Sequence, residues 1–197
     1  MTITRERFDS GLTYQQWLDG ITQNKERFLK NYEAAQIGAE DVAAFKKLPH
    51  PLNVLVLGED WCGDVIANLP ILARLADAAG GKLNLRIFKR DANLDIMDQY
   101  LYQGQFRSIP AIVFFDQAMS ELGRWWERPQ MARNEMDEAR RRFVAEHADL
   151  PDVGKPVPAM SETTRQIFTA FFGRLRAENT ARWAQAVVDE WRTILGF

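Results

Sequence analysis

The chain has 197 residues and a formal net charge of −2, with 46% hydrophobic and 26% charged residues. This is the composition of an ordinary globular protein with one core and attached segments. It disfavours a polyanionic partner, because the one cluster of basic residues, at 140–142, shares an expected helix with several acids. We therefore expect no nucleic-acid binding.

The N-terminus has no apolar signal region, and no stretch reaches the roughly 18 uninterrupted apolar residues of a membrane span. We expect no membrane association. The single cysteine cannot form an internal disulfide, which fits a reducing compartment. These features predict a cytoplasmic protein.

The first fifty residues have a helical pattern and predict a helical N-terminal extension over 1–50. Thr13 and Gln16 resemble a capping box, and one helix is expected from there to Gly38. A shorter helix over 41–47 follows, and the Pro-His-Pro sequence at 49–51 ends the extension.

Residues 51–147 alternate between strand and helix patterns. The continuous apolar run 52–57 predicts a strand buried on both faces, and the apolar segment 64–79 predicts the helix that follows it. A strand, helix, strand order implies a parallel crossover. The remaining expected elements are strands at 83–88, 111–115 and 121–126 and helices at 94–102 and 130–146.

The last fifty residues, 148–197, predict a linker and a helical C-terminal extension that packs on the core. Prolines and a glycine mark the linker at 149–161. The tail after it has helical spacing of aromatic residues, and Asn179 or Thr180 could cap a second helical segment within it.

Cys62 lies where the first expected strand passes to its helix, within the sequence Glu-Asp-Trp-Cys-Gly-Asp-Val at 59–65. Ligands and reactive groups collect at such junctions in α/β sheets. The free N–H groups and partial positive charge of a helix N-terminus stabilise a thiolate. Cys62 is therefore the candidate reactive residue, and a buried, inert thiol is the alternative interpretation.

Two motifs resemble the thioredoxin superfamily. Trp61-Cys62-Gly63 followed by Pro70 resembles its active-site helix, and the sequence Phe-Arg-Ser-Ile-Pro ending at Pro110 resembles its cis-proline loop. The turn is most similar to that of a bacterial group with Trp-Cys-Gly-Asp and no second cysteine. The resemblance implies an α/β thioredoxin-like fold, with a central mixed sheet of about four strands flanked by helices.

The same resemblance implies the site. Cys62 would be the catalytic residue, and the residues that bind the substrate would be Trp61, Gly63, Asp64, Arg107, Ile109 and Pro110. Pro110 is expected in the cis form, and together with the Ile109 backbone it would position a partner strand. Residues after the fourth strand, namely Trp125, Trp126, Arg128 and Pro129, would line one side.

Two departures from the thioredoxin pattern narrow the expected chemistry. Val65 stands at the second cysteine position, and Val56 stands where the family keeps a buried aspartate. Without a resolving thiol, Cys62 would need glutathione or another low-molecular-weight thiol as co-substrate rather than a bound cofactor. The expected partner is such a thiol or a disulfide-containing protein.

Charge around Cys62 disfavours its thiolate. Glu59, Asp60 and Asp64 lie within three residues, and each carboxylate at roughly 7 Å in water would cost the thiolate about 0.6 kcal/mol. Arg107 is the one cation that the motif alignment places nearby.

Two functions follow as hypotheses from different classes. The first is a monothiol thiol-disulfide oxidoreductase, and the alternative is a redox-inactive thioredoxin-fold module that binds a peptide or partner protein. An iron–sulfur monothiol glutaredoxin is a third option, but the chain has neither its Cys-Gly-Phe-Ser motif nor its preceding lysine. With two histidines and one cysteine, no zinc site is expected. The oligomeric state stays open.

Overall fold

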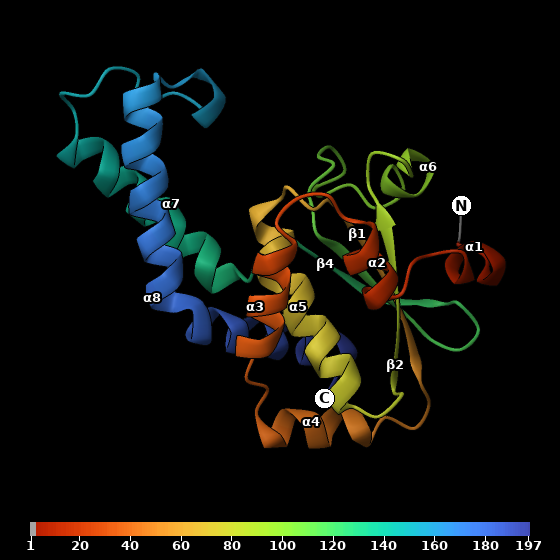
Figure 1. The fold of residues 1–197 in the computed structure, drawn as a ribbon. Helices are drawn as coiled ribbons and strands as arrows, with labels where there is room; N and C mark the ends of the chain where they lie inside the picture. The colour runs from red at the N-terminus through yellow and green to blue at the C-terminus, as the bar shows by residue number, and fades with distance from the viewer. Residues whose placement is uncertain (1–2) are drawn as a thin grey trace. The chain divides into compact units, whose positions relative to one another are not determined.

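The computed structural model describes residues 3–197 and contains one four-stranded sheet (Figure 1). Its strands are β1 (Leu52–Gly58), β2 (Leu83–Lys89), β3 (Ala111–Phe115) and β4 (Glu121–Trp126). They lie in the order β2-β1-β3-β4. β1 pairs parallel to β2 and antiparallel to β3, and β3 pairs antiparallel to β4. The predicted mixed sheet of the thioredoxin-like fold is confirmed.

The two central strands are buried on both faces, as their apolar runs predict. Every residue of β1 and of β3 is buried. β2 is an edge strand; its residues alternate between buried and half-buried from Leu83 to Ile87, and Phe88 is buried as well. Leu12 forms an isolated bridge to Ile87 on the outer side of β2, so part of that edge is covered.

Between residue 3 and β4 the structure has six helices. They are α1 (Arg5–Asp9), α2 (Tyr14–Gly20), α3 (Lys25–Ala34), α4 (Ala39–Lys46), α5 (Gly63–Ala78) and α6 (Leu94–Met97). α5 connects β1 to β2, and α3 lies beside it (Figure 1). The Asn31 amide on α3 donates to the Ile66 carbonyl on α5 at 2.7 Å. The helix expected over 94–102 is shorter than predicted, because α6 has a single turn.

The long helix expected from Thr13 to Gly38 is interrupted at residues 21–24. The Thr22 and Gln23 backbone N–H groups donate to the Asp60 carboxylate at 3.0 and 3.1 Å. Asn24 then adopts a left-handed conformation, with φ at 57°, before α3 begins. A distant carboxylate therefore takes donors that a continuous helix would have used internally. The capping box of Thr13 and Gln16 is present, as predicted.

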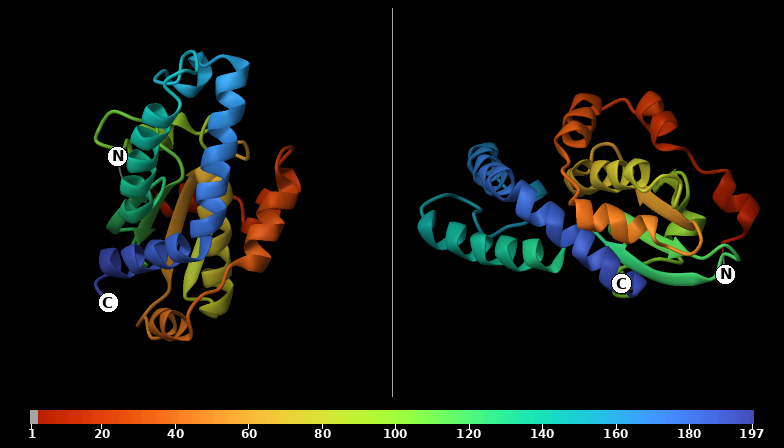
Figure 2. Two further views of the ribbon diagram at one scale, coloured as in Figure 1. Left: turned by 90° about the vertical axis from the view of Figure 1, so that its left-hand side faces the viewer. Right: turned by 90° about the horizontal axis from the view of Figure 1, so that it is seen from below.

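The chain divides into two compact units. The first runs up to Arg128 and also includes Val187–Phe197, and the second is Pro129–Ala186. The second unit holds α7 (Gln130–Glu146), a 3-10 turn (Val157–Ala159) and most of α8 (Glu162–Leu195). Phe143, Phe168 and Trp183 are central members of its apolar core. α8 thus contributes to both units, and Figure 2 shows it as one continuous run of helix.

The tail forms one helix where a second capped segment was predicted. The Asn179 and Thr180 side chains donate to the Leu175 and Arg176 carbonyls, each at 2.8 Å. Both residues therefore bond to the carbonyl four positions earlier and do not cap a helix start. The prediction of a cap at Asn179 or Thr180 is wrong for this reason.

The end of α8 belongs to the core of the first unit. Trp191 is fully buried and packs edge-on against Trp125 of β4, with ring centroids 5.8 Å apart. The Trp125 indole N–H donates to Glu190 at 2.6 Å. Arg192 pairs with the buried Asp41 of α4 at 2.7 Å. The last residues of the chain are thus needed to cover β4.

Candidate functional site

Cys62 is the residue that precedes α5, four residues after the end of β1. Its thiol is half-buried and donates to the Ile109 carbonyl, with 3.5 Å between Sγ and the oxygen. The Ile109–Pro110 peptide bond is cis, as predicted, and β3 begins directly after it. The fold therefore brings the two sequence motifs into direct contact.

Two of the three acids in the turn are structural. Glu59 is 8% exposed and accepts the Asp91 backbone N–H at 2.8 Å. Asp60 is 9% exposed and holds the segment between α2 and α3 by two backbone N–H groups. Both carboxylates therefore have donors of their own within the fold.

The environment of Cys62 favours its neutral thiol. Burial is the main cause that raises the pKa of Cys62, and the Asp64 carboxylate adds to the rise. The backbone N–H groups of Val65 and Asp64 and the Arg128 cation oppose it. The net pKa shift is upward. Of the acids in the turn, Asp64 is the one that raises the pKa of Cys62, and desolvation raises this pKa more than Asp64 does.

Arg128, and not Arg107, is the cation that acts on the cysteine. The Arg107 guanidinium forms two bonds to Asp98, with Nε–Oδ1 at 2.7 Å and Nη2–Oδ2 at 2.8 Å. Arg128, just after β4, pairs with the buried Asp64 beside Cys62. The motif alignment places Arg107 nearby and leaves open whether it acts on the thiol; in the structure its guanidinium is bonded to Asp98, and Arg128 is the cation that lowers the pKa of Cys62.

The turn that carries Arg128 is attached to α5 through Asn68. The Asn68 amide donates to the Glu127 carbonyl at 2.8 Å and to the Asp64 carbonyl at 3.0 Å. Asn68 is 5% exposed. The sequence analysis did not select it, although an amide on a mainly apolar helix is a signal for a buried polar contact.

Exposed aromatic side chains occur in both motifs that meet at the cysteine: Trp61 directly precedes Cys62, and Phe106 begins the loop that leads to Pro110. Trp61 is 48% exposed, and Phe106 is 53% exposed. The Arg90 guanidinium lies over the Trp61 ring at 5.1 Å and donates to the Arg107 carbonyl at 3.4 Å. Arg90 thereby links the turn of Cys62 to the loop before Pro110, a role that sequence reasoning missed.

Gly63 and Asp64 begin α5 next to the thiol. A side-chain carbon at Gly63 would meet no atom within 4 Å, so the fold leaves open space there. Asp64 is in the first turn of the helix, where a carboxylate is stabilised by the helix dipole. Among residues 3–197, no group of three or more His, Cys, Asp and Glu side chains could hold a metal ion.

Comparison with known proteins identifies the family. A family profile described as Thioredoxin matches residues 11–140, well over half of the chain. The chain belongs to the thioredoxin family. In residues 3–197, no helix is long and apolar enough to cross a membrane. No curated protein matches the sequence.

Two solved structures share the thioredoxin-family fold of this chain. A protein of unknown function from Pseudomonas aeruginosa is 22% identical with a TM-score of 0.60, over 74% of this chain and 89% of that one. An HIV epitope-scaffold is 18% identical with a TM-score of 0.63, over 97% of this chain and 96% of that one. At these identities the likeness concerns the fold alone.

Within this thioredoxin fold, valines occupy the two positions where the family pattern has reactive groups. Val65 and Val56 are both fully buried. Val65 packs so closely on β1 that a side-chain carbon at Gly58 would lie 3.0 Å from its Cγ1. Both positions are thus filled as parts of an apolar core.

Proposed function

We propose that this thioredoxin-family chain is a binding module that holds an extended segment of a partner protein beside Cys62, with the cysteine acting as a contact and not as a redox group. The observation that carries the proposal is the state of the thiol. Cys62 donates to the Ile109 carbonyl and lies next to Asp64 in a half-buried position. A thiol held in its protonated form is a poor nucleophile.

The surface around the thiol supports binding. Trp61 and Phe106 expose large aromatic areas, and such residues contribute much of the binding energy of protein interfaces. Arg90 restrains the Trp61 ring, which reduces the entropy that binding would cost. Arg107 is exposed and Ser108 is half-buried, and both lie outside the strands just before the cis-proline, so a partner chain can reach this part of the loop.

The binding test uses peptides selected on the immobilised protein from a random phage library. For the selected peptide, we expect Cys62→Ser to change the Kd less than about twofold. Trp61→Ala should weaken binding by about tenfold or more, as loss of a central aromatic contact does. Leu122→Ala is the matched control, because Leu122 is also exposed, at 44%, but lies on β4. Equal losses in the Trp61 and Leu122 variants would contradict this location.

A monothiol oxidoreductase is the second candidate function, favoured by the backbone N–H groups of Asp64 and Val65 and by Arg128, all of which lower the pKa of Cys62. In that reaction the Cys62 thiolate would attack a glutathione mixed disulfide and release the substrate thiol. A second glutathione would then free Cys62 and leave as oxidised glutathione.

The redox test measures the alkylation rate of Cys62 against pH together with turnover of a glutathione mixed disulfide. The binding module predicts an alkylation midpoint above about 8.5, the ordinary cysteine value, and no turnover above the Cys62→Ser level. A midpoint below that value with Cys62-dependent turnover would establish the oxidoreductase instead.

A further inference from the structure

A groove of about 480 Å³ lies along α4, where the last residues of the chain pack beside this helix. Its lining comes from one face of α4 and the segment after it, within residues 40–49, and from Arg192 and Phe197. We call it the α4 groove. α4 precedes the start of β1, whereas Cys62 follows the end of that strand, so about 20 Å of strand separates the two places (Figure 1). The α4 groove is therefore distinct from the cysteine site.

The α4 groove has apolar walls that the fold holds in place. The Phe197 ring packs edge-on against the buried Phe45 of α4, with ring centroids 5.1 Å apart, yet 38% of Phe197 stays exposed. The Phe197 backbone N–H donates to the Arg192 carbonyl at 3.1 Å, which fixes the end of the chain. Leu48 is half-buried and Pro49 is exposed. Apolar surface of this kind with a charged rim is typical of an interaction site.

Opposite charges stand at the two ends of the α4 face. Glu40 is in the first turn of the helix and Lys47 directly follows its last residue, and both residues are exposed. Neither side chain forms an ion pair within residues 3–197. The third charged residue of the lining, Arg192, is already paired with Asp41 at 2.7 Å. The charges of Glu40 and Lys47 are thus available to a partner.

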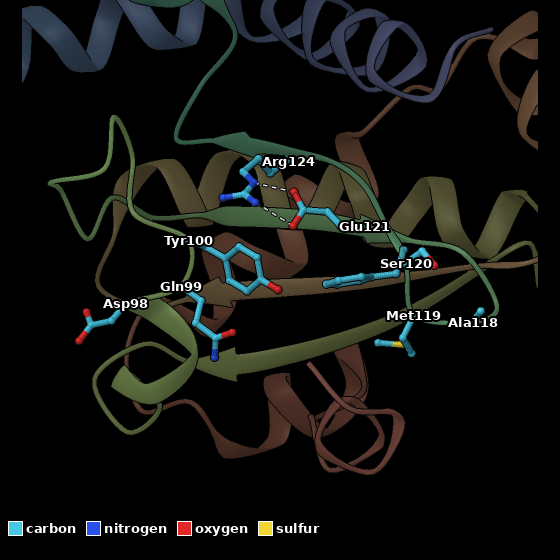
Figure 3. Close-up of a pocket in the computed structure, with 9 residues that line it drawn as sticks. Asp98, Gln99, Tyr100, Ala118, Met119, Ser120, Glu121 and Arg124 are labelled. Carbon is cyan, nitrogen blue, oxygen red and sulfur yellow. Dashed lines mark hydrogen bonds and ion pairs between the residues drawn. The ribbon is translucent and has the colours of Figure 1, made fainter. Parts of the chain in front are cut away.

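A larger hollow in the same unit, of about 640 Å³, differs in this respect (Figure 3). Its Arg124 guanidinium binds Glu121 through two bonds, at 2.6 and 2.8 Å, and Figure 3 shows the two side chains directed at each other. Asp98 at the same hollow is bonded to Arg107. Those charges are satisfied within the chain, so only the α4 groove presents charges that a partner can complement.

The order of residues along the α4 face is self-complementary. Residues 40, 43, 44 and 47 have the i, i+3, i+4 and i+7 spacing that places them on one face of a helix. A two-fold axis between Ala43 and Ala44 sets a second α4 antiparallel to the first, with Glu40 of each chain opposite Lys47 of the other. The centre of this face carries only methyl groups, so the two helices can approach closely.

We propose that the α4 groove binds a second copy of this chain, so that the protein forms a two-fold dimer through its α4 helices. Each α4 lies in the groove of the other copy and covers the apolar surface of Leu48 and Phe197. Two Glu40–Lys47 pairs, one at each end, set the antiparallel orientation. One pair of short helices buries less surface than a standard interface, so the dimer dissociates on dilution.

The test is analytical ultracentrifugation of the full chain, over about 10 to about 500 µM because an interface of this size is weak. We expect the mass to rise with concentration from 22.7 kDa toward twice that value. Glu40→Lys and Lys47→Glu each place like charges opposite each other twice in the dimer, and each should weaken self-association by about tenfold. An equimolar mixture of these two variants has both attractive pairs again and should associate as strongly as the unaltered chain.

The matched controls are Glu33→Lys and Lys30→Glu, which make the same charge changes at exposed residues of α3, outside the groove lining. Both controls should associate as the unaltered chain does. The proposal is overturned if the full chain stays at 22.7 kDa over the whole concentration range. It is equally overturned if the mixture of Glu40→Lys and Lys47→Glu associates no better than either variant alone, or if the controls lose as much association as the groove variants.

Discussion

At the scale of single residues, burial is the main cause that raises the pKa of Cys62, and the charged side chains that modulate this pKa are Asp64 and Arg128. Arg128 favours the thiolate and Asp64 disfavours it, and the two side chains are bonded to each other. The thiol thus lies beside a nearly neutral pair. Removing either partner leaves the opposite charge next to the sulfur, so the two substitutions should have opposite effects.

We predict that Arg128→Gln raises the pKa of Cys62 further and that Asp64→Asn lowers it. The measurement is the pH midpoint of alkylation by iodoacetamide. Arg107→Gln is the matched control and should leave the midpoint unchanged, because the Arg107 guanidinium is exposed and bonded to Asp98. A shift with Arg107→Gln as large as that with Arg128→Gln would contradict this account.

Sequence reasoning placed Cys62, the cis Ile109–Pro110 bond and the two buried valines, because local motifs mark those positions. It named Arg128 only as a residue lining one side of the site and could not show its pairing with Asp64, which is 64 positions away in the chain. Arg107 is part of the proline motif, but its guanidinium bonds to Asp98, an acid from the segment after α6. Which of two arginines reaches a site is decided by competing carboxylates, and a single sequence does not show them.

At the scale of elements, the Asp60 carboxylate determines where the N-terminal helices break. Residues 14–32 keep helical spacing of apolar positions, so periodicity alone predicts a continuous helix. The interruption at 21–24 forms because Asp60, far along the chain, binds two backbone N–H groups there. By contrast, β3 and β4 have the predicted bounds, since pairing within the sheet agrees with their local pattern.

We predict that Asp60→Ala lowers the free energy of unfolding by about 2 kcal/mol, the usual scale for hydrogen bonds to a charged group. Urea unfolding measures the change. Asp19→Ala is the control, because Asp19 is 62% exposed in its ion pair with Lys25 and should contribute less than about 0.5 kcal/mol. Equal losses in the two variants would show that Asp60 does not hold the break.

The tight packing between β4 and the end of α8 can also be tested by substitution. A side-chain carbon at Gly123 would lie 2.4 Å from the Ile194 Cγ2. We predict that Gly123→Ala lowers the free energy of unfolding by about 1–3 kcal/mol, as overpacking does. Adding Ile194→Ala should recover part of that loss relative to Ile194→Ala alone.

Gly173, a glycine within α8, provides the control for Gly123 of β4. A side-chain carbon at Gly173 meets nothing within 4 Å, so Gly173→Ala should raise the free energy of unfolding by about 0.5–1 kcal/mol through helix propensity. Thermal or urea unfolding separates the two signs. A loss at Gly173 as large as that at Gly123 would mean that the Ile194 contact is not the cause.

At the scale of the whole molecule, α8 links two compact units that have separate cores. Trp191 packs with Trp125 in the first unit, and Trp183 packs with Phe172 and Phe143 in the second. The Trp183 indole N–H donates to Glu135 at 2.9 Å, and Arg182 pairs with the same acid. The two tryptophans are eight positions apart in one helix, yet each belongs to a different core.

We predict that Trp191→Ala and Trp183→Ala expose different parts of the chain to hydrogen exchange. Each loss of a buried tryptophan should cost its own core about 3–5 kcal/mol. Trp183→Ala should speed exchange in α7 and in α8 up to Ala186, and leave β1 and β3 protected. Trp191→Ala should speed exchange in the sheet, because Trp125 loses its packing partner. If either variant speeds exchange to the same extent in both units, the two units unfold together. In that case the continuous hydrogen bonding of α8 transmits the loss of one core to the other.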